Sequence, residues 1–358
     1  MPVLLIIPTG IGCSVGGYAG DAIPFARLLA AASGCLITHP NVMNGASLYW
    51  NDTRIQYVEG FGIDLFTAGE IYLRPVRQQR IGLLFDKALE PELIARQLHV
   101  VNACHASIGL DVGPIVTTDK ALGISCTKGS SGSSWGGIEF PDSLLRAGEK
   151  LKEEGASAVA VVTRFPDQSD DNAFEVYRKG KGVDTMAGAE AIISHLLVRH
   201  LSIPCAHAPA LSTVPMIKDL DPRAAAEEIG YTFLPSVLVG LSRAPDLVQV
   251  DRGGVYENTS TSNLLRIEEL GAAVVPEGAL GGASVLACIE RKIPVIVVAN
   301  QSVLNIDQEA IGIKDTLNFG NQRLILRASS YQEAAGLLLG LREGIAISSL
   351  QRPIKQVT

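Results

Sequence analysis

The stretch VLLIIPTGIGCSVGGYAGDA, residues 3–22, runs from an apolar segment through a loop with five glycines into a helix-like pattern. The apolar residues at 3–7 do not alternate with polar ones, which is typical of a strand buried on both faces of a parallel sheet. Glycine lets a ligand approach the backbone, and N–H groups at a helix start attract anions. This stretch therefore predicts an α/β fold with a candidate binding loop after the first strand.

Similar apolar runs recur along the chain and alternate with helix-like patterns, which implies right-handed crossovers and a mostly parallel sheet. Hydrophobic residues make up 47% of the chain and aromatic residues only 5%, so aliphatic side chains supply the core. We expect an α/β protein with one or more mostly parallel sheets flanked by helices, and two similar Rossmann-like subdomains are one arrangement that fits. The expected strands include 3–7, 35–38, 81–85, 158–162, 203–208, 236–241, 272–275, 293–299 and 323–328, and the expected helices 141–154, 187–201, 222–229, 281–291 and 330–342.

The expected domain division places residues 1–150, with both glycine-rich loops, in an N-terminal α/β unit and residues 151–358 in a C-terminal one. VVTRFPD at 161–167 is echoed by GLSRAPD at 240–246. Each is followed by a glycine-led helix pattern and a strand that starts with Ile-Pro. A duplication of 161–210 and 240–300 explains this echo, and so does the repeated strand–helix unit of any α/β protein.

Charge, hydropathy and cysteine content indicate which classes of partner and which cellular compartment to expect. The net charge of -7 comes without a basic cluster, which argues against nucleic acid. No apolar stretch approaches the roughly 18 residues of a membrane span, and MPVLLIIPTG lacks a basic leader. The six scattered cysteines form no C-x-x-C pair and indicate reduced thiols. We expect a cytoplasmic protein that does not bind membranes and that self-associates as a homo-oligomer, because chains so rich in aliphatic residues often do.

Polar residues and glycines follow the expected strands, and ligands of open parallel sheets bind beyond the carboxyl ends of the strands. This edge of the sheet is the predicted ligand site. The candidate ligand-binding residues are Thr9, Gly10, Gly12, Gly16, Gly17, Asn41, Ser130, Ser133, Arg164, Asp167, Arg243, Asp246, Gly281, Gly282 and Asn300.

The spacing G-x-G-x-x-x-G in GIGCSVG is a variant of the dinucleotide fingerprint. A Rossmann site also needs an acidic residue at the end of the second strand, where this chain has Thr38 and His39. No G-K-[ST] follows, so the Walker pattern fails as well. We therefore favour a small carboxylate or phosphate over a dinucleotide in this loop, expect no cofactor, and keep NADP and a purely structural turn as alternatives.

His39 and His207, each at an expected strand exit, are the candidates for proton transfer, because histidine titrates near neutral pH. Asp21, Asp167 or Asp246 is their candidate partner, and a structural role for either histidine is the alternative. His195 and His200 would lie roughly 140° apart on a helix, so we expect no metal site.

A second glycine-rich stretch, GISCTKGSSGSSWGGIEF at 123–140, holds Lys128 among serines. A Ser–Lys pair such as Ser131 with Lys128 makes a nucleophile when the lysine is desolvated. A closing lid, a ligand contact and a plain loop are the alternatives.

Arg164 and Arg243 each follow an expected buried strand, where an unpartnered charge is costly. Either each arginine pairs with the aspartate three residues on, Asp167 or Asp246, or it clamps a carboxylate or phosphate of the substrate.

Several segments, among them PTGIGCSVGGYAGDAIP, THPNVMNGASLYW, KGKGVDTMAGAEAIISHL and GLSRAPD, resemble a protein family common in cyanobacteria and plastids and catalogued as a domain of unknown function. The resemblance spans essentially the whole chain. It implies a cytosolic or stromal protein and brings no reaction or catalytic residue with it.

The residues together favour an enzyme that binds a small anionic metabolite and uses metal-free acid–base chemistry of the hydrolase, lyase or isomerase type. A non-catalytic ligand-binding or regulatory protein is the alternative from another class. An NADP-dependent oxidoreductase is the third hypothesis.

Overall fold

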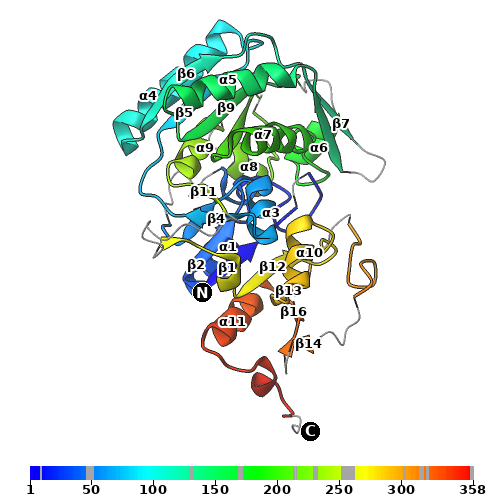
Figure 1. Ribbon diagram of the computed structural model, residues 1–358. Helices are drawn as coiled ribbons and strands as arrows, with labels where there is room; N and C mark the ends of the chain where they lie inside the picture. Colours follow the sequence, from blue (N-terminus) through cyan, green and yellow to red (C-terminus); the bar gives the residue numbers. More distant parts are fainter. Residues whose placement is uncertain are drawn as a thin grey trace.

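Two parallel sheets organise the chain, one of six strands and one of four, and they lie one below the other in Figure 1. The α/β expectation is confirmed. The computed structural model describes residues 1–8, 10–45, 52–128, 133–167, 172–212, 214, 216–228, 233–250, 263–300, 304–313, 318–319 and 322–354.

The six-stranded sheet has the order β16-β13-β12-β1-β2-β3, and all of its strands are parallel. Numbered along the chain, these strands run 3-2-1-4-5-6 across the sheet, which is the Rossmann order with its switch point between β1 and β12. We call this sheet and its helices the six-stranded unit. Its strands are β1 (Pro2–Leu5), β2 (Cys35–Thr38), β3 (Ile55–Tyr57), β12 (Ala272–Pro276), β13 (Val295–Val298) and β16 (Ile325–Ala328).

Helices cover both faces of this sheet, which explains the unbroken apolar runs of its strands. Val3 and Leu5 face one hydrophobic cluster, with α1 and α11, whereas Leu4 faces another, with α3 and α10. Ser330 caps α11 by accepting a hydrogen bond from the N–H of Glu333. The helices of this unit are α1 (Ile23–Ser33), α2 (Pro40–Met43), α3 (Gly60–Ala68), α10 (Ala283–Glu290) and α11 (Tyr331–Arg342), with short 3-10 turns at Ile267–Glu269 and Ile347–Leu350.

The four-stranded sheet has the order β10-β9-β5-β6 and is also parallel. It lies in the chain between β3 and β12, so we call it, with its helices, the inserted unit. Its α5 and α7 cover one face, and α4 and α9 cover the other. The bounds are β5 (Ile81–Phe85), α4 (Pro91–Ile108), β6 (Val112–Thr117), α5 (Pro141–Glu153), β9 (Ala158–Arg164), α7 (Ala187–Leu201), β10 (Cys205–Ala210) and α9 (Leu234–Leu241).

Smaller elements join the two units. An antiparallel pair, β4 (Ile71–Arg74) with β11 (Asp246–Gln249), stands where the chain enters and leaves the inserted unit. The hairpin β7 (Ile124–Lys128) and β8 (Ser134–Ile138) packs on α7. Helices α6 (Asn172–Arg178) and α8 (Pro222–Glu228) pack together, and β14 (Asn318–Phe319) pairs with β15 (Gln322–Arg323).

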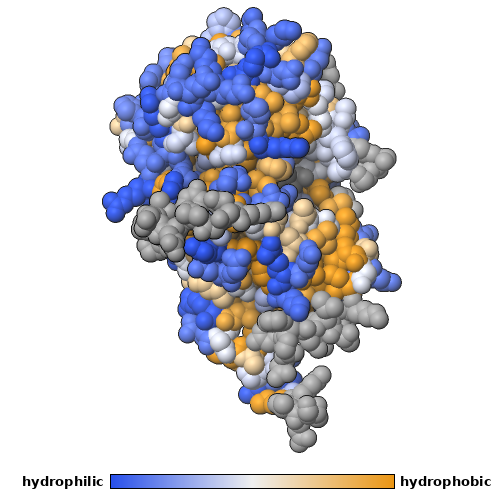
Figure 2. Space-filling model, in the orientation of Figure 1, coloured by the Kyte–Doolittle hydropathy of each residue, from blue (hydrophilic) through white to orange (hydrophobic). Residues whose placement is uncertain are grey.

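The surface follows these packing faces. Figure 2 shows a largely hydrophilic surface over α5, whose buried side includes Leu144 and Leu151. Apolar residues gather on the flank of the six-stranded unit where α10 lies, and Leu286 of that helix is 40% exposed.

The two sheets divide the chain into a middle part and two outer parts, and not into two consecutive halves. The six-stranded sheet takes strands from both ends of the chain, and residue 150 falls within α5 of the inserted unit. The echoed segments each contain two adjacent parallel strands, β9 with β10 and β12 with β13. Their duplication stays a prediction.

One expected strand is wrong, because residues 236–241 belong to helix α9. Pro235 stands in the first turn of this helix, and Leu234, Val237, Leu238 and Leu241 are buried. A short apolar run buried on all sides has no periodicity that separates a helix from a strand.

Candidate active site between the two units

A cavity of about 90 Å³ lies where the carboxyl ends of β2 and β3 meet the inserted unit. It brings together three predicted site residues, His39, Asn41 and His207, from distant parts of the chain. Its lining from the six-stranded unit is Ala19, His39, Pro40, Asn41, Asn44, Glu59 and Gly60, and from the inserted unit Glu190, Ala191, Ser194, His195 and His207.

His39 follows β2 and is 8% exposed. Its Nε2 accepts a hydrogen bond of 3.1 Å from the backbone N–H of Ile7, at the exit of β1. Burial lowers the pKa of His39 to about 4, so the ring is neutral at pH 7. Because Nε2 is the acceptor, Nδ1 carries the proton, and His39 can act as a neutral hydrogen-bond donor.

His207 on β10 faces Glu190 on α7 across the cavity, with 4.0 Å between Nδ1 and Oε2. Its Nε2 lies 3.1 Å from Oγ1 of Thr163. Burial lowers the pKa of His207 to about 3, whereas burial and the nearby carboxyl of Asp184 raise the pKa of Glu190 well above its usual range. The two pKa values are thus displaced in opposite directions, which favours the neutral imidazole of His207 and the protonated carboxyl of Glu190.

Glu59 and His195 form an ion pair at the other side of the cavity, with 2.7 Å between Oε1 and Nδ1. Burial alone would lower the pKa of His195, but the hydrogen bond and charge of Glu59, with smaller effects of the Ala191 backbone and of Asp64, together raise this pKa. Glu59 also caps α3 through the N–H of Phe61. His200, on the same helix as His195, contacts Glu149 instead, at 2.6 Å.

The sequence analysis missed three of these residues, Glu59, Glu190 and His195, as members of a proton-transfer site. Glu190 and His195 lie in the KGKGVDTMAGAEAIISHL segment, but nothing in their helical spacing shows that α7 packs against the exits of β2 and β3.

The glycine-rich loop after β1 contacts protein groups of both units. Gly10 accepts a hydrogen bond of 3.1 Å from the N–H of Ser134, and a Cβ at Gly10 would lie 2.3 Å from the Ser134 hydroxyl. The N–H of Gly16 donates to the carboxylate of Asp21 at 2.6 Å, and burial raises the pKa of Asp21 to about 6. Gly12 and Gly17 lie in the same loop, where a Cβ at Gly17 would meet backbone atoms of the chain itself. Thr9 lies outside the described residues.

Other exits of the six-stranded sheet converge on this loop. Asn300, two residues beyond β13, accepts hydrogen bonds from the N–H of Ser14, at 3.1 Å, and from its hydroxyl. Gly281 and Gly282 precede α10 on the exit of β12. Of the buried side-chain atoms without a hydrogen-bond partner among the described residues, three belong to this edge: Asp21 Oδ2, Asn300 Nδ2 and Tyr331 OH.

The two arginines differ. Arg164 pairs with Asp167 at 2.9 Å and with Glu90 at 3.0 Å, so the internal pairing holds there. Asp246 instead accepts from Arg74 and from Gln79, both at 2.8 Å, so the internal pairing is wrong for Arg243. The β4–β11 pairing places Asp246 opposite Arg74, so this long-range pairing, and not the local spacing to Arg243, decides the partner of Asp246.

The second glycine-rich stretch forms the hairpin β7–β8, with Lys128 at the end of β7 and Ser133 just before β8. The Ser133 hydroxyl accepts from the indole N–H of Trp135 at 3.2 Å. Ser130 and Ser131 lie outside the described residues. The described part of the stretch contributes no residue to the cavity lining.

Within the described ranges of the chain no helix has the length and apolar character needed to cross a membrane. The same ranges hold no group of three or more histidine, cysteine, aspartate or glutamate side chains arranged to bind a metal ion.

A Rossmann-ordered sheet with a second α/β unit inserted over its carboxyl edge, and a polar cavity between the two, defines a two-unit α/β protein with a candidate site at the junction. The chain belongs to the family described as "Protein of unknown function (DUF3326)", whose model matches residues 2–351. It is 47% identical over 348 residues to an uncharacterized lipoprotein of Synechococcus sp. (strain ATCC 27144 / PCC 6301 / SAUG 1402/1), covering 97% of this chain and 92% of that protein. No solved structure matches the chain significantly. The resemblance to a full-length cyanobacterial family is thereby confirmed.

Proposed function

We propose that this protein is an enzyme that carries out acid–base chemistry on a small metabolite held between the two units. One observation carries the proposal: His207 and Glu190 face each other across the cavity with pKa values displaced in opposite directions. Environments that separate the pKa values of two neighbouring groups are how active sites assign an acid and a base at one pH.

The roles follow from the facing geometry and from the directions of the two pKa displacements. His207 accepts a proton from the substrate, and the carboxyl of Glu190 returns one to it. His39 donates a hydrogen bond from Nδ1, and the His195–Glu59 pair supplies a fixed dipole where charge develops. Such a set suits an isomerase or lyase that moves a proton at carbon, and a hydrolase that protonates a leaving group.

The cavity is small compared with the roughly 300–1,000 Å³ of most metabolite pockets, so it suits the reacting group of a substrate. The His195 side chain in this lining is already paired with Glu59. A neutral polar reacting group fits this lining best. The predicted anionic character of the metabolite then concerns a part of the molecule outside the cavity.

An NADP-dependent oxidoreductase is the second candidate, because the six-stranded sheet has the dinucleotide-binding strand order. Two observations disfavour it. Thr38, at the end of β2, is fully buried and donates to the carbonyl of Leu5 at 2.8 Å, so it offers nothing to a ribose. The N–H of Gly16 is bound to Asp21.

We propose that the protein acts in the cytoplasm with β1 in place. A bacterial lipoprotein carries its lipid on a cysteine that becomes the start of the mature chain. Cys13 is 8% exposed and follows β1, which pairs with both β12 and β2 in the middle of the sheet. Processing at Cys13 would remove that strand. Mass spectrometry of the protein purified from its native host tests this, because a lipid-modified chain starting at Cys13 contradicts it.

The test of function is a thermal-shift screen of carboxylates, sugar phosphates and nucleotides, followed by turnover assays on every ligand that stabilises the protein. For a converted ligand, we expect His207→Gln and Glu190→Gln to lower kcat about 100-fold or more while ligand binding changes little. His200→Gln is the matched control, because this histidine shares α7 but lies outside the cavity lining.

Three outcomes decide between the hypotheses. Conversion that depends on His207 and Glu190 supports the enzyme. Ligands that stabilise the chain without conversion, with equal shifts in the two variants, favour a non-catalytic ligand-binding protein and overturn the proposal. A large shift with NADPH alone favours the oxidoreductase.

A further inference from the structure

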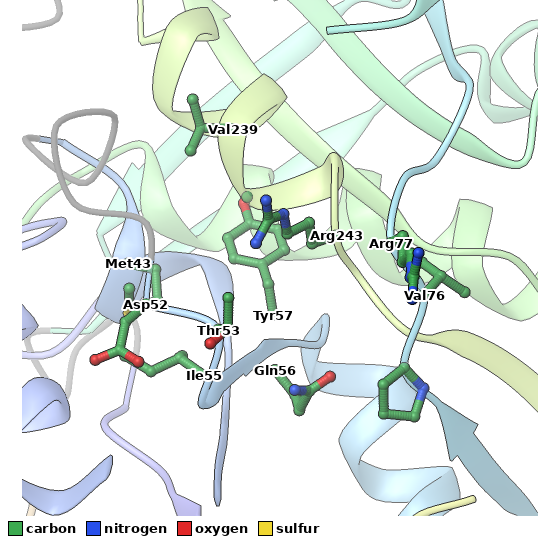
Figure 3. Close-up of a pocket in the computed structure, with 12 residues that line it drawn as sticks. Met43, Asp52, Thr53, Ile55, Gln56, Tyr57, Val76, Arg77, Val239 and Arg243 are labelled. Atoms are coloured by element: carbon green, nitrogen blue, oxygen red, sulfur yellow. The ribbon is translucent and has the colours of Figure 1, made fainter. Parts of the chain in front are cut away.

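A second pocket, of about 350 Å³, lies where the chain passes between the two units. Figure 3 shows its lining side chains. The six-stranded unit contributes Met43, Asp52, Thr53, Ile55, Gln56 and Tyr57. Helix α9 of the inserted unit contributes Val239 and Gly240, and the segments leading into and out of that unit contribute Pro75, Val76, Arg77 and Arg243.

Two arginine side chains, Arg77 and Arg243, line this pocket, and both residues are exposed. In the part of the chain that the structure describes, no hydrogen bond or ion pair engages the guanidinium group of Arg77 or of Arg243. The aspartate closest to Arg243 in sequence, Asp246, is bound to Arg74 and Gln79. The structure therefore puts two arginines in this lining, and the acid nearest to Arg243 in sequence is bound to other partners.

The acidic residue in the lining is also accounted for. Asp52 accepts two hydrogen bonds from Arg54, at 2.9 Å and 2.6 Å, and these bonds hold the pKa of Asp52 below its ordinary value. With Asp52 paired to Arg54, Arg77 and Arg243 give the described part of the lining a positive charge. Guanidinium groups bind carboxylate and phosphate oxygens in pairs, so this charge fits an oxyanion.

Much of the remaining lining is apolar, beside the polar side chains of Thr53 and Gln56. The Tyr57 ring packs so closely on α9 that a Cβ at Gly240 would lie 2.5 Å from it. Met43, Ile55, Val76 and Val239 add aliphatic surface. A ligand with an apolar or aromatic body and one anionic group matches both parts of this lining.

We propose that this pocket binds a small organic oxyanion, with its carboxylate or phosphate on Arg77 and Arg243 and its body against Tyr57. The site is separate from the acid–base cavity and does not depend on the function proposed for it. It touches the cavity through one residue, since the Tyr57 hydroxyl donates to Asn44 at 2.9 Å and Asn44 lines the cavity. A bound oxyanion bridges the two units at the point where they join.

Titration calorimetry at low ionic strength tests the proposal with phenyl phosphate and benzoate as probes, inorganic phosphate for the anion alone, and benzyl alcohol for the neutral body. We expect saturable binding of at least one aromatic oxyanion and none of benzyl alcohol. Phenyl phosphate and benzoate separate a phosphate from a carboxylate ligand. We expect Arg77→Gln and Arg243→Gln each to lower the affinity for the bound probe about tenfold or more.

Arg80→Gln is the matched control, because Arg80 lies on the same connecting segment but outside the pocket lining, and it should leave the affinity within about threefold. His207→Gln should bind the probe as the unchanged protein does, which separates this site from the cavity. Thermal unfolding without ligand checks that each variant is folded. The proposal is overturned if no oxyanion binds saturably at 10 mM, or if the double variant of Arg77 and Arg243 binds as tightly as the unchanged protein.

Discussion

The buried carboxyl of Glu227 makes a quantitative prediction about stability. Glu227 lies on α8, is 7% exposed, and accepts a hydrogen bond of 2.6 Å from the Tyr177 hydroxyl of α6. Burial, with the nearby carboxyl of Asp184, raises its pKa from 4.5 to about 8, against the opposing effect of the Tyr177 hydrogen bond. The folded chain therefore holds this group protonated at pH 7, whereas the unfolded chain leaves it ionised.

The sign of the pH dependence follows. Glu227 has a higher pKa in the folded chain than in the unfolded chain. Its contribution to folding stability is therefore fully present below pH 4.5 and is lost as the pH rises to about 8. At about 1.4 kcal/mol per pKa unit, keeping Glu227 protonated costs the folded state roughly 3 kcal/mol at pH 7 and under about 1 kcal/mol at pH 5. Glu227→Gln removes this cost, because an amide is neutral at every pH and retains an acceptor oxygen for Tyr177.

Equilibrium urea unfolding at pH 5, 7 and 8.5, followed by circular dichroism, measures the effect. We expect Glu227→Gln to be nearly neutral at pH 5 and increasingly stabilising at pH 7 and 8.5. A free-energy difference that is the same at all three pH values, or a variant that is less stable at pH 8.5 than the unchanged protein, refutes the reasoning.

The neighbouring residue is a control of opposite sign. Glu228 pairs with Arg178, at 2.8 Å, and the Arg178 side chain is only 5% exposed. Glu228→Gln leaves that buried guanidinium without its charge partner, so we expect a loss of about 3 kcal/mol at pH 7.

Two further predictions follow from packing and from burial. A Cβ at Gly136 would lie 2.3 Å from the Ala189 backbone of α7, so we expect Gly136→Ala to lower the free energy of unfolding by more than about 2 kcal/mol. A Cβ at Gly137 meets only the Ser125 hydroxyl, at 3.0 Å, so Gly137→Ala should lower it by less than about 1 kcal/mol. Thermal unfolding of the two variants measures this difference. Burial raises the pKa of Cys126 and of Cys288 to about 12, so both thiols should react with a disulfide reagent at pH 8 much more slowly in the native protein than in urea, and equal rates measured by peptide mapping would contradict this.

The fold was predictable where burial on both faces marks the strand. VLLII, CLIT and AVAVV lack alternation because helices cover both sides of their sheets. The strands that the sequence analysis did not anticipate are short or half-exposed, such as β3 at Ile55–Tyr57 and β4, whose last residue is exposed. The insertion between β3 and β12 was not readable, because it depends on β1 pairing with β12, with Val3 opposite Ala272.

The candidate site was predictable to the extent that it uses strand exits. His39 and Asn41 stand at the exit of β2, where a parallel sheet exposes polar residues, and the structure brings them to one cavity with His207. Glu59 and Glu190 were not predictable, because each reaches the cavity through the contact between units. The same long-range pairing gives Asp246 to Arg74 and leaves Arg243 in the second pocket.

The glycine-rich loop acquires a different interpretation from its contacts. Tyr18 stacks on Tyr177 of the inserted unit with 4.3 Å between ring centroids and donates to its backbone carbonyl at 2.7 Å, while Gly10 lies against Ser134. Its glycines allow close approach, but the described contacts are to protein and hold the two units together. Because His39 and His207 belong to different units, the distance between them depends on this joint. Loosening the loop should therefore disturb the cavity even though, apart from Ala19, its residues stand outside the lining.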